Sequence, residues 1–182
     1  CAKRILLAVG GRPARPDIPG AELGWISDDM FLQNDFPEKV VIIGAGFIAC
    51  EFSCILNGLG IEVVQMIRGK DLLRGFDYEV SSLLKAHMQE AGIEFCIGER
   101  PKYLEGRLGN MKVVTDIGSE IMSGGILFAT GRRPFLRGLN LELSGVDFSE
   151  GRIAVDSSQA TNVPHIYAVG DVTDHINLTP VA

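Results

Sequence analysis

The sequence predicts an α/β fold, in which helices flank a parallel β-sheet and a small antiparallel β-meander is attached. A short β-branched run, Val40 to Ile43, has the character of a buried strand. A glycine-rich turn, a helical pattern and a second β-branched run, Glu62 to Ile67, follow it, which makes a strand–helix–strand unit of about thirty residues. Between Lys102 and Met122 the pattern changes to short strand-like pieces separated by turns. The expected architecture is therefore Rossmann-like.

The turn after the first strand reads Gly44-Ala45-Gly46-Phe47-Ile48-Ala49, which is the G-x-G-x-x-A pattern of dinucleotide sites. Gly44 allows the tight turn, Gly46 lets the backbone approach a pyrophosphate, and Ala49 lets the helix pack close to the strand. The helix N-terminus then offers free N–H groups and the positive end of its dipole to the phosphates. We predict dinucleotide binding here; the alternative is a tight turn without a ligand.

The helix that follows carries an apolar stripe of the kind that packs against a core, at Ile48, Phe52, Ile55 and Leu59. Glu51 lies among apolar and small neighbours, and its carboxylate is either part of an ion pair or exposed to solvent. Phe47 either gates a flat ring pocket or packs in the core, and the residues alone favour the core. Cys50 and Cys54 lie one helical turn apart and are interpreted as small, mostly buried thiols rather than a redox pair.

The segments before this unit form a short strand and a connection. The strand, Arg4 to Val9, ends in a Gly-Gly-Arg-Pro sequence, and ILLAVGGRP has a near-copy, ILFATGRRP, at Ile126 to Pro134. We interpret the near-copies as two crossings of the chain between one domain and another. The connection, Arg12 to Asp35, is expected to be an ordered loop with a short helix around Met30 to Gln33, capped by Ser27 or Asp28.

After the second strand, Asp77 is a plausible N-cap for a helix that Gly92 ends. A third strand is expected at Ile93 to Ile97. Near the end, a strand at Ile166 to Val169 leads into Gly170 and Asp171, and Thr179 before a proline resembles a helix N-cap.

Two arginines follow the second strand, where an NAD-binding fold usually has a carboxylate that holds the ribose 2′-hydroxyl. Ile67 takes that place here, with Arg68 after it and Arg74 six residues later. The planar fork of arginine binds phosphate through two hydrogen bonds, so the pair suits a 2′-phosphate. We predict NADP rather than NAD; the alternative is a solvated basic turn balanced by Asp71 and Asp77.

The composition is that of an ordinary globular protein, because 46% of the 182 residues are hydrophobic and 22% are charged. A net charge of −6 argues against general nucleic-acid binding. No apolar run approaches the roughly twenty residues of a membrane span, and no signal peptide is visible. The four cysteines and three histidines show no metal-ligand spacing. We expect a cytoplasmic protein without a metal site and without nucleic acid or membrane as a partner.

Seven motifs in order, AVGGRP, IPG, GAGFIACEF, MIRGKDLLRGFD, ATGRRP, YAVGDV and LTPVA, resemble those of the FAD-containing pyridine nucleotide–disulfide oxidoreductases, and within them the glutathione reductases. The resemblance implies three parts: 1–11 as the end of a first FAD-domain segment, 12–134 as an NADPH-binding domain, and 135–182 as the start of a second FAD-domain segment. It assigns NADPH binding to Gly44, Gly46, Phe47, Ile48, Ala49, Glu51, Arg68, Arg74 and Gly131, and FAD binding to Asp171 and Thr179.

Within these assignments, Phe47 stands at a usual tyrosine position, where a ring covers the nicotinamide pocket, and Glu51 matches a supporting carboxylate that pairs with a lysine near the flavin. The resemblance implies that the whole protein, a homodimer, passes electrons from NADPH to FAD, then to a cysteine disulfide, then to glutathione disulfide. The catalytic cysteines and histidine lie outside this chain, so we expect the chain alone to be inactive. Related alternatives are a dihydrolipoamide dehydrogenase, a mercuric reductase, a modified-glutathione reductase, or a stand-alone NADP-binding module.

Overall fold

The computed structural model describes residues 2–149 and 151–173. Its chain divides into two compact units, one formed by Pro13–Gly131 and the other by Cys1–Arg12 with Arg132–Ala182. Thr179, predicted to cap a helix and to bind FAD, lies outside the described residues. Within the described part of the chain, no helix has the length and apolar character that a bilayer crossing requires.

The larger unit is built on a five-stranded sheet with the strand order β3-β10-β4-β5-β6 and parallel pairing throughout. The strands are β3 (Trp25–Ile26), β4 (Lys39–Ile43), β5 (Glu62–Ile67), β6 (Glu94–Ile97) and β10 (Gly125–Phe128). Two helices connect the central strands, α2 (Phe47–Gly58) and α3 (Tyr78–Glu90). The predicted α/β fold class is therefore confirmed.

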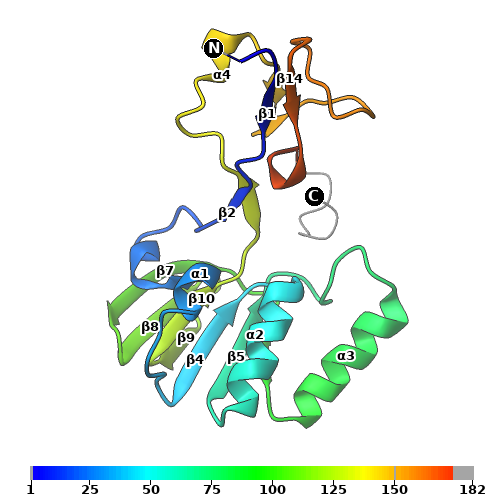
Figure 1. The fold of residues 1–182 in the computed structure, drawn as a ribbon. Coiled ribbons are helices and arrows are strands. Elements are labelled where there is room, and N and C mark those ends of the chain that lie inside the picture. The colour runs from blue at the N-terminus through cyan, green and yellow to red at the C-terminus, as the bar shows by residue number, and fades with distance from the viewer. Residues whose placement is uncertain (1, 150, 174–182) are drawn as a thin grey trace. The chain divides into compact units, whose positions relative to one another are not determined.

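Both faces of this sheet are buried, which explains why its strands are almost continuously apolar. Along β4, Val40 and Ile42 join the core that contains residues of α2 and α3, while Val41 and Ile43 join the core on the opposite face. That second core is completed by the predicted antiparallel meander of β7 (Pro101–Arg107), β8 (Asn110–Thr115) and β9 (Glu120–Ser123). Figure 1 shows the two helices and the meander on their separate sides of the sheet.

The predicted connection before β4 differs from the observed one in two ways. It contains a short 3-10 helix, η1 (Ala21–Leu23), and the edge strand β3, which sequence patterns did not indicate. The helix α1 spans Ser27–Met30 instead of Met30 to Gln33, so Ser27 and Asp28 lie inside it and do not cap it. Its N-terminus is held by Asp29, whose Oδ2 accepts a 2.8 Å hydrogen bond from the amide of Ile26.

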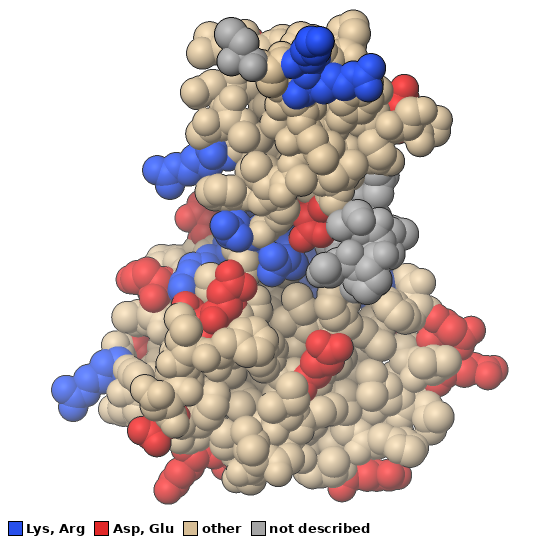
Figure 2. All heavy atoms as spheres, in the orientation of Figure 1, with Lys and Arg blue, Asp and Glu red and all other residues tan. Residues whose placement is uncertain are grey.

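The apolar stripe predicted for α2 is only partly buried: Ile48 and Phe52 are half-buried, and Phe52 packs against the core. The buried residues are Leu56 and three small ones, Ala49, Cys50 and Ser53, which allow the helix to lie close to the sheet. Ile55 and Leu59 are instead 53% and 66% exposed. Figure 2 shows the surface in the region of α2 as largely uncharged. The tight packing that Ala49 permits decides which side of the helix faces inward.

The smaller unit has its own core, formed by Leu141, Val146, Ile153, Ile166, Ala168 and Val172. Strand β1 (Ile5–Leu7) pairs in parallel with β14 (Ile166–Ala168), and β12 (Phe148–Ser149) pairs with β13 (Arg152–Ile153). A short helix α4 (Leu141–Ser144) and a 3-10 helix η2 (Gly170–Thr173) complete it. The Arg-Pro ends of the two near-copies pair with each other as β2 (Gly11–Pro13) and β11 (Arg132–Pro134).

Candidate dinucleotide site

The two glycines of the turn between β4 and α2 are glycines for different reasons. Gly44 has a φ of +151°, and a Cβ atom there would lie 2.2 Å from the carbonyl oxygen of Ala129. Gly46 has a φ of −84°, which any residue can adopt, and a Cβ atom there would meet no atom of a described residue within 4 Å. The surrounding protein therefore demands a glycine at Gly44, whereas the space in front of Gly46 is left open. A pyrophosphate that approaches the backbone needs this space.

The N-terminus of α2 opens at the same turn. Gly46 is the N-cap, and no side chain of a described residue caps the helix through a hydrogen bond. The first bond of the helix runs from the amide of Cys50 to the carbonyl of Gly46, at 3.1 Å. The amide groups of the first turn, from Phe47 to Ala49, are therefore available to an anion, and the helix dipole favours negative charge there. The residues present fit a pyrophosphate group.

Strand β5 holds the turn from behind. The amide of Gly44 donates to the carbonyl of Met66 at 3.0 Å, and the carbonyl of Gly44 accepts from Nε2 of Gln65 at 2.9 Å. The Oγ of Ser53, on α2, donates to Oε1 of Gln65 at 2.9 Å. The side chains of Gln65 and Ser53 are both completely buried. Sequence patterns did not single out either residue, although a lone amide in the apolar run of β5 was a usable signal.

The two predicted phosphate ligands lie on the loop between β5 and α3. Arg68 and Arg74 are exposed, and neither forms an ion pair with a described residue. Asp77 is not their counter-ion, because its Oδ1 accepts hydrogen bonds from the amides of Glu79 (2.8 Å) and Val80 (3.2 Å). The predicted N-cap role of Asp77 is thus confirmed. Among the described residues, nothing pairs with either guanidinium group, so both can receive an anion.

For two residues of α2, Phe47 and Glu51, the sequence allowed two interpretations each. Phe47, the first residue of the helix, is 38% exposed, so the interpretation that it packs in the core is wrong. Glu51 is also exposed, and it forms no ion pair with a described residue. Of its two interpretations, solvent exposure is the one observed in this chain.

Two further predicted ligands, Gly131 and Asp171, belong to different units. In the larger unit, Gly131 is exposed with a φ of +124°, and its carbonyl accepts a 2.9 Å hydrogen bond from the amide of Ala14. In the smaller unit, Oδ2 of Asp171 lies 3.7 Å from Nε of Arg132, whose NH2 group donates to the carbonyl of Gly11 at 3.0 Å. The side chain of Asp171 is 20% exposed.

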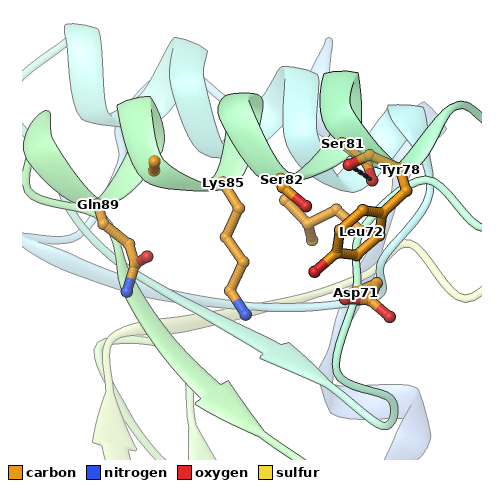
Figure 3. Close-up of a pocket in the computed structure, with 8 residues that line it drawn as sticks. Asp71, Leu72, Tyr78, Ser81, Ser82, Lys85 and Gln89 are labelled. Atoms are coloured by element: carbon orange, nitrogen blue, oxygen red, sulfur yellow. Dashed lines mark hydrogen bonds between the residues drawn. The ribbon is translucent and has the colours of Figure 1, made fainter.

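A separate cavity of about 240 Å³ lies between α3 and the loop that joins β5 to α3. This loop carries Arg68 and Arg74 and is called the arginine loop below. It is lined by Asp71, Leu72, Tyr78, Ser81, Ser82, Lys85, Ala86 and Gln89. Figure 3 shows Lys85 and Gln89 extending from the same side of α3. Lys85 donates to the carbonyl of Lys70 at 2.9 Å, so its ammonium group already helps to hold the loop. None of the lining residues belongs to the glycine turn or to the arginine pair.

The described cysteines do not have the environment of reactive thiols. Cys50 is buried, and this burial raises the pKa of its thiol. Burial, with a hydrogen bond to Glu99, raises the pKa of Cys96 to about 12. Cys54 is exposed, so the interpretation that both thiols of the pair on α2 are mostly buried holds for Cys50 and is wrong for Cys54. A reactive cysteine needs a lowered pKa, and no described cysteine has one.

Comparisons with known proteins bear on the whole chain. Residues 1–182 match a family described as pyridine nucleotide-disulphide oxidoreductase. The chain is 43% identical over 182 residues to a glutathione reductase of Burkholderia cepacia, covering 100% of this chain and 40% of that protein. It is 44% identical over 188 residues to thioredoxin reductase 2, mitochondrial, of Drosophila melanogaster, covering 98% of this chain and 36% of that protein.

Among solved structures, the chain resembles the HOCl-induced flavoprotein disulfide reductase RclA from Escherichia coli, with a TM-score of 0.91 at 21% identity. The likeness covers 98% of this chain and 42% of that one. At this identity it shows the fold alone. The chain spans roughly two-fifths of the length of the relatives that it matches.

Proposed function

This chain belongs to the pyridine nucleotide-disulphide oxidoreductase family, and we propose that it supplies the NADPH-binding part of a flavin-dependent disulfide reductase. The observation that carries the proposal is the glycine turn, where open space at Gly46 meets the uncapped N-terminus of α2. A pyrophosphate requires both features, because its oxygens accept hydrogen bonds from backbone amides at close approach. When bound, NADPH supplies the hydride that a flavin accepts.

The proposed NADPH site has two parts. The turn, with Gly44, Gly46 and the first residues of α2, receives the pyrophosphate. The loop with Arg68 and Arg74 receives the 2′-phosphate. This assignment is supported by the exposure of both side chains and by their lack of an ion pair with any described residue. A hydrogen bond to a charged group contributes about 1.5–3 kcal/mol, so two such contacts give a preference for NADPH over NADH of roughly a hundred- to ten-thousand-fold.

The nicotinamide end of the site involves Phe47, Ile48, Glu51 and Gly131. We propose that Phe47 covers the nicotinamide pocket, and its 38% exposure at the start of α2 leaves the ring accessible for this role. Glu51 is proposed to support the reaction as a carboxylate near the flavin. Its exposure in this chain is compatible with a partner contributed by another part of the protein.

The FAD-binding part of the proposal concerns the smaller unit. Residues 1–11 and 135–182 are assigned to two segments of an FAD domain, and 12–134 to the NADPH-binding domain inserted between them. The division of the chain into Pro13–Gly131 and the two flanking segments supports these boundaries. Asp171 is the proposed FAD ligand in this unit, with Thr179 beyond the described residues.

Glutathione disulfide is the substrate that we propose for the whole protein. Sequence identity does not by itself select it, because a glutathione reductase at 43% and a thioredoxin reductase at 44% are equally similar to this chain. The ordered motifs of the sequence favour the glutathione reductases. We also propose that the whole protein is a cytoplasmic homodimer, formed through a part outside this chain, with a role in cell redox homeostasis. The isolated chain is proposed to be inactive.

Nucleotide affinity of the full-length protein tests the site directly. Wild type is expected to bind NADPH far more tightly than NADH. Arg68→Ala and Arg74→Ala should each weaken NADPH binding about 10- to 150-fold and leave NADH binding nearly unchanged. Arg107→Ala, at the exposed end of β7, is the matched control and should change neither affinity. Equal affinities of wild type for the two nucleotides would overturn the NADPH assignment.

A further inference from the structure

Gln65 is a completely buried polar residue beside the glycine turn. It lies in the middle of β5 between Val64 and Met66, with none of its surface exposed to solvent. A primary amide in such a place costs free energy unless its donors and acceptor find partners. The partners it has are the carbonyl of Gly44, the hydroxyl of Ser53 and, weakly at 3.9 Å, the Sγ of Cys50.

The orientation of this amide follows from chemistry. The carbonyl of Gly44 can only accept a hydrogen bond, so the NH2 end of Gln65 must face it. The Oε1 end then faces Ser53, whose hydroxyl can donate. A reversed amide would place two oxygens against each other at the turn. The carbonyl of Gly44 therefore sets the orientation of the amide, and the hydroxyl of Ser53 satisfies its oxygen.

We infer that Gln65 is a positioning residue for the dinucleotide, acting through the carbonyl of Gly44, with Ser53 as its support. This inference rests on the proposed function of the turn. Met66 holds the amide of Gly44 and Gln65 holds its carbonyl, so the whole peptide environment of Gly44 is tied to β5. Gly46, two residues on, is where the backbone faces the pyrophosphate. Gln65 touches no part of the nucleotide itself.

Substitutions of Gln65 and of the arginines should affect the affinities for NADPH and NADH differently. The pyrophosphate is common to NADPH and NADH, so a loosened turn weakens both nucleotides by the same factor. Gln65→Leu removes both hydrogen bonds at similar volume and should weaken both affinities about 5- to 30-fold, with the NADPH to NADH ratio unchanged. Ser53→Ala keeps the bond to Gly44 and should weaken both about 2- to 5-fold.

Val64→Ala is the matched control. Val64 is the neighbour of Gln65 on β5 and packs in the core on the other face of the sheet. Its truncation removes buried apolar contacts from the same strand without touching the turn, so it should lower stability and leave both affinities within about two-fold of wild type. A general loss of stability would instead move all three variants together.

Gln65→Glu provides a readout that a merely structural role would not move. A protonated glutamic acid can donate to Gly44 and accept from Ser53 as glutamine does, whereas the carboxylate can only accept. Nucleotide affinity of Gln65→Glu should therefore approach wild type at acidic pH and fall as the pH rises, while wild type shows no such added dependence. This variant also tests the inference if Gln65→Leu does not fold.

These measurements use the full-length protein and titration with NADPH and NADH. A Gln65→Glu affinity that follows the wild-type pH profile, or Gln65→Leu affinities equal to those of wild type, would show the inference to be wrong while the arginine results stand. Failure of wild type to bind either nucleotide would instead overturn the proposed function itself.

Discussion

The amide of Leu73 donates a 2.7 Å hydrogen bond to the carbonyl of Ala45, which ties the arginine loop to the glycine turn. Leu73 adopts a φ of 50°, a left-handed conformation that costs a leucine free energy of order 1–3 kcal/mol. Neighbouring Leu72 is only 1% exposed and anchors the loop in the core beneath α2 and α3. The two parts of the proposed NADPH site are thus connected through a few atoms.

Truncation of that anchor should affect both stability and nucleotide preference. Leu72→Ala is expected to lower the free energy of unfolding by about 2–5 kcal/mol, because a buried leucine leaves a cavity. The loosened loop should also weaken NADPH more than NADH, since only NADPH carries the 2′-phosphate that we propose Arg68 and Arg74 bind. Denaturant unfolding and nucleotide titration measure the two effects. Leu83→Ala, a leucine of α3 that is 61% exposed, should change neither.

Substitution by alanine should mainly lower stability at Gly44 and mainly lower nucleotide affinity at Gly46. Gly44→Ala forces a methyl group against the carbonyl of Ala129 at a positive φ, and should cost more than about 3 kcal/mol of stability. Gly46→Ala should change stability by no more than about 1 kcal/mol. Its methyl group enters the space that we propose for the pyrophosphate, so both nucleotides should bind weakly. Urea unfolding and nucleotide titration of both variants measure these effects. A Gly44→Ala protein as stable as wild type would contradict the close approach of Gly44 to the carbonyl of Ala129.

The fold was largely predictable because its signals are local. The β-branched runs of β4 and β5 and the capping aspartate Asp77 each stand close in sequence to what they determine. The buried side of α2 was not predictable from hydrophobicity, because close packing at Ala49 turns small residues inward and leaves Ile55 outside. The short strand β3 forms only because β10, about a hundred residues later, pairs with it.

The site shows the same division between local and distant causes. The candidate ligands Gly44, Gly46, Arg68 and Arg74 could be predicted from their spacing, since their motif is a short stretch of sequence. The role of Gln65 depends on which atoms β5 and α2 bring together, and a sequence pattern records only that an amide interrupts an apolar strand.

The environment of Cys96 predicts how thiol chemistry and stability depend on pH. Burial and a hydrogen bond to Glu99 raise the pKa of this thiol from 9.0 to about 12. At pH 9 about one Cys96 side chain in a thousand is therefore a thiolate, against about half for an ordinary cysteine. Maleimide at pH 9 should label the exposed Cys54 much faster than Cys96, as peptide mass spectrometry can measure.

The raised pKa of Cys96 also makes the stability of the protein depend on pH. The unfolded chain loses the Cys96 proton near pH 9, whereas the folded chain keeps it to about pH 12, so the contribution of this thiol to the free energy of unfolding falls across that interval. Cys96→Ala should flatten this part of the stability profile, and Cys54→Ser should leave it unchanged. Labelling of Cys96 and Cys54 at equal rates would contradict the assigned environment.

Anaerobic reduction of the flavin in the full-length protein tests the central claim most directly. Mixing the protein with NADPH or NADH and following flavin absorbance measures whether this chain is the entry point for electrons. We expect rapid bleaching by NADPH, much slower bleaching by NADH, and loss of the difference in an Arg68→Ala/Arg74→Ala protein. A full-length protein that carries no flavin, or whose flavin is reduced equally fast by both nucleotides, would contradict the account.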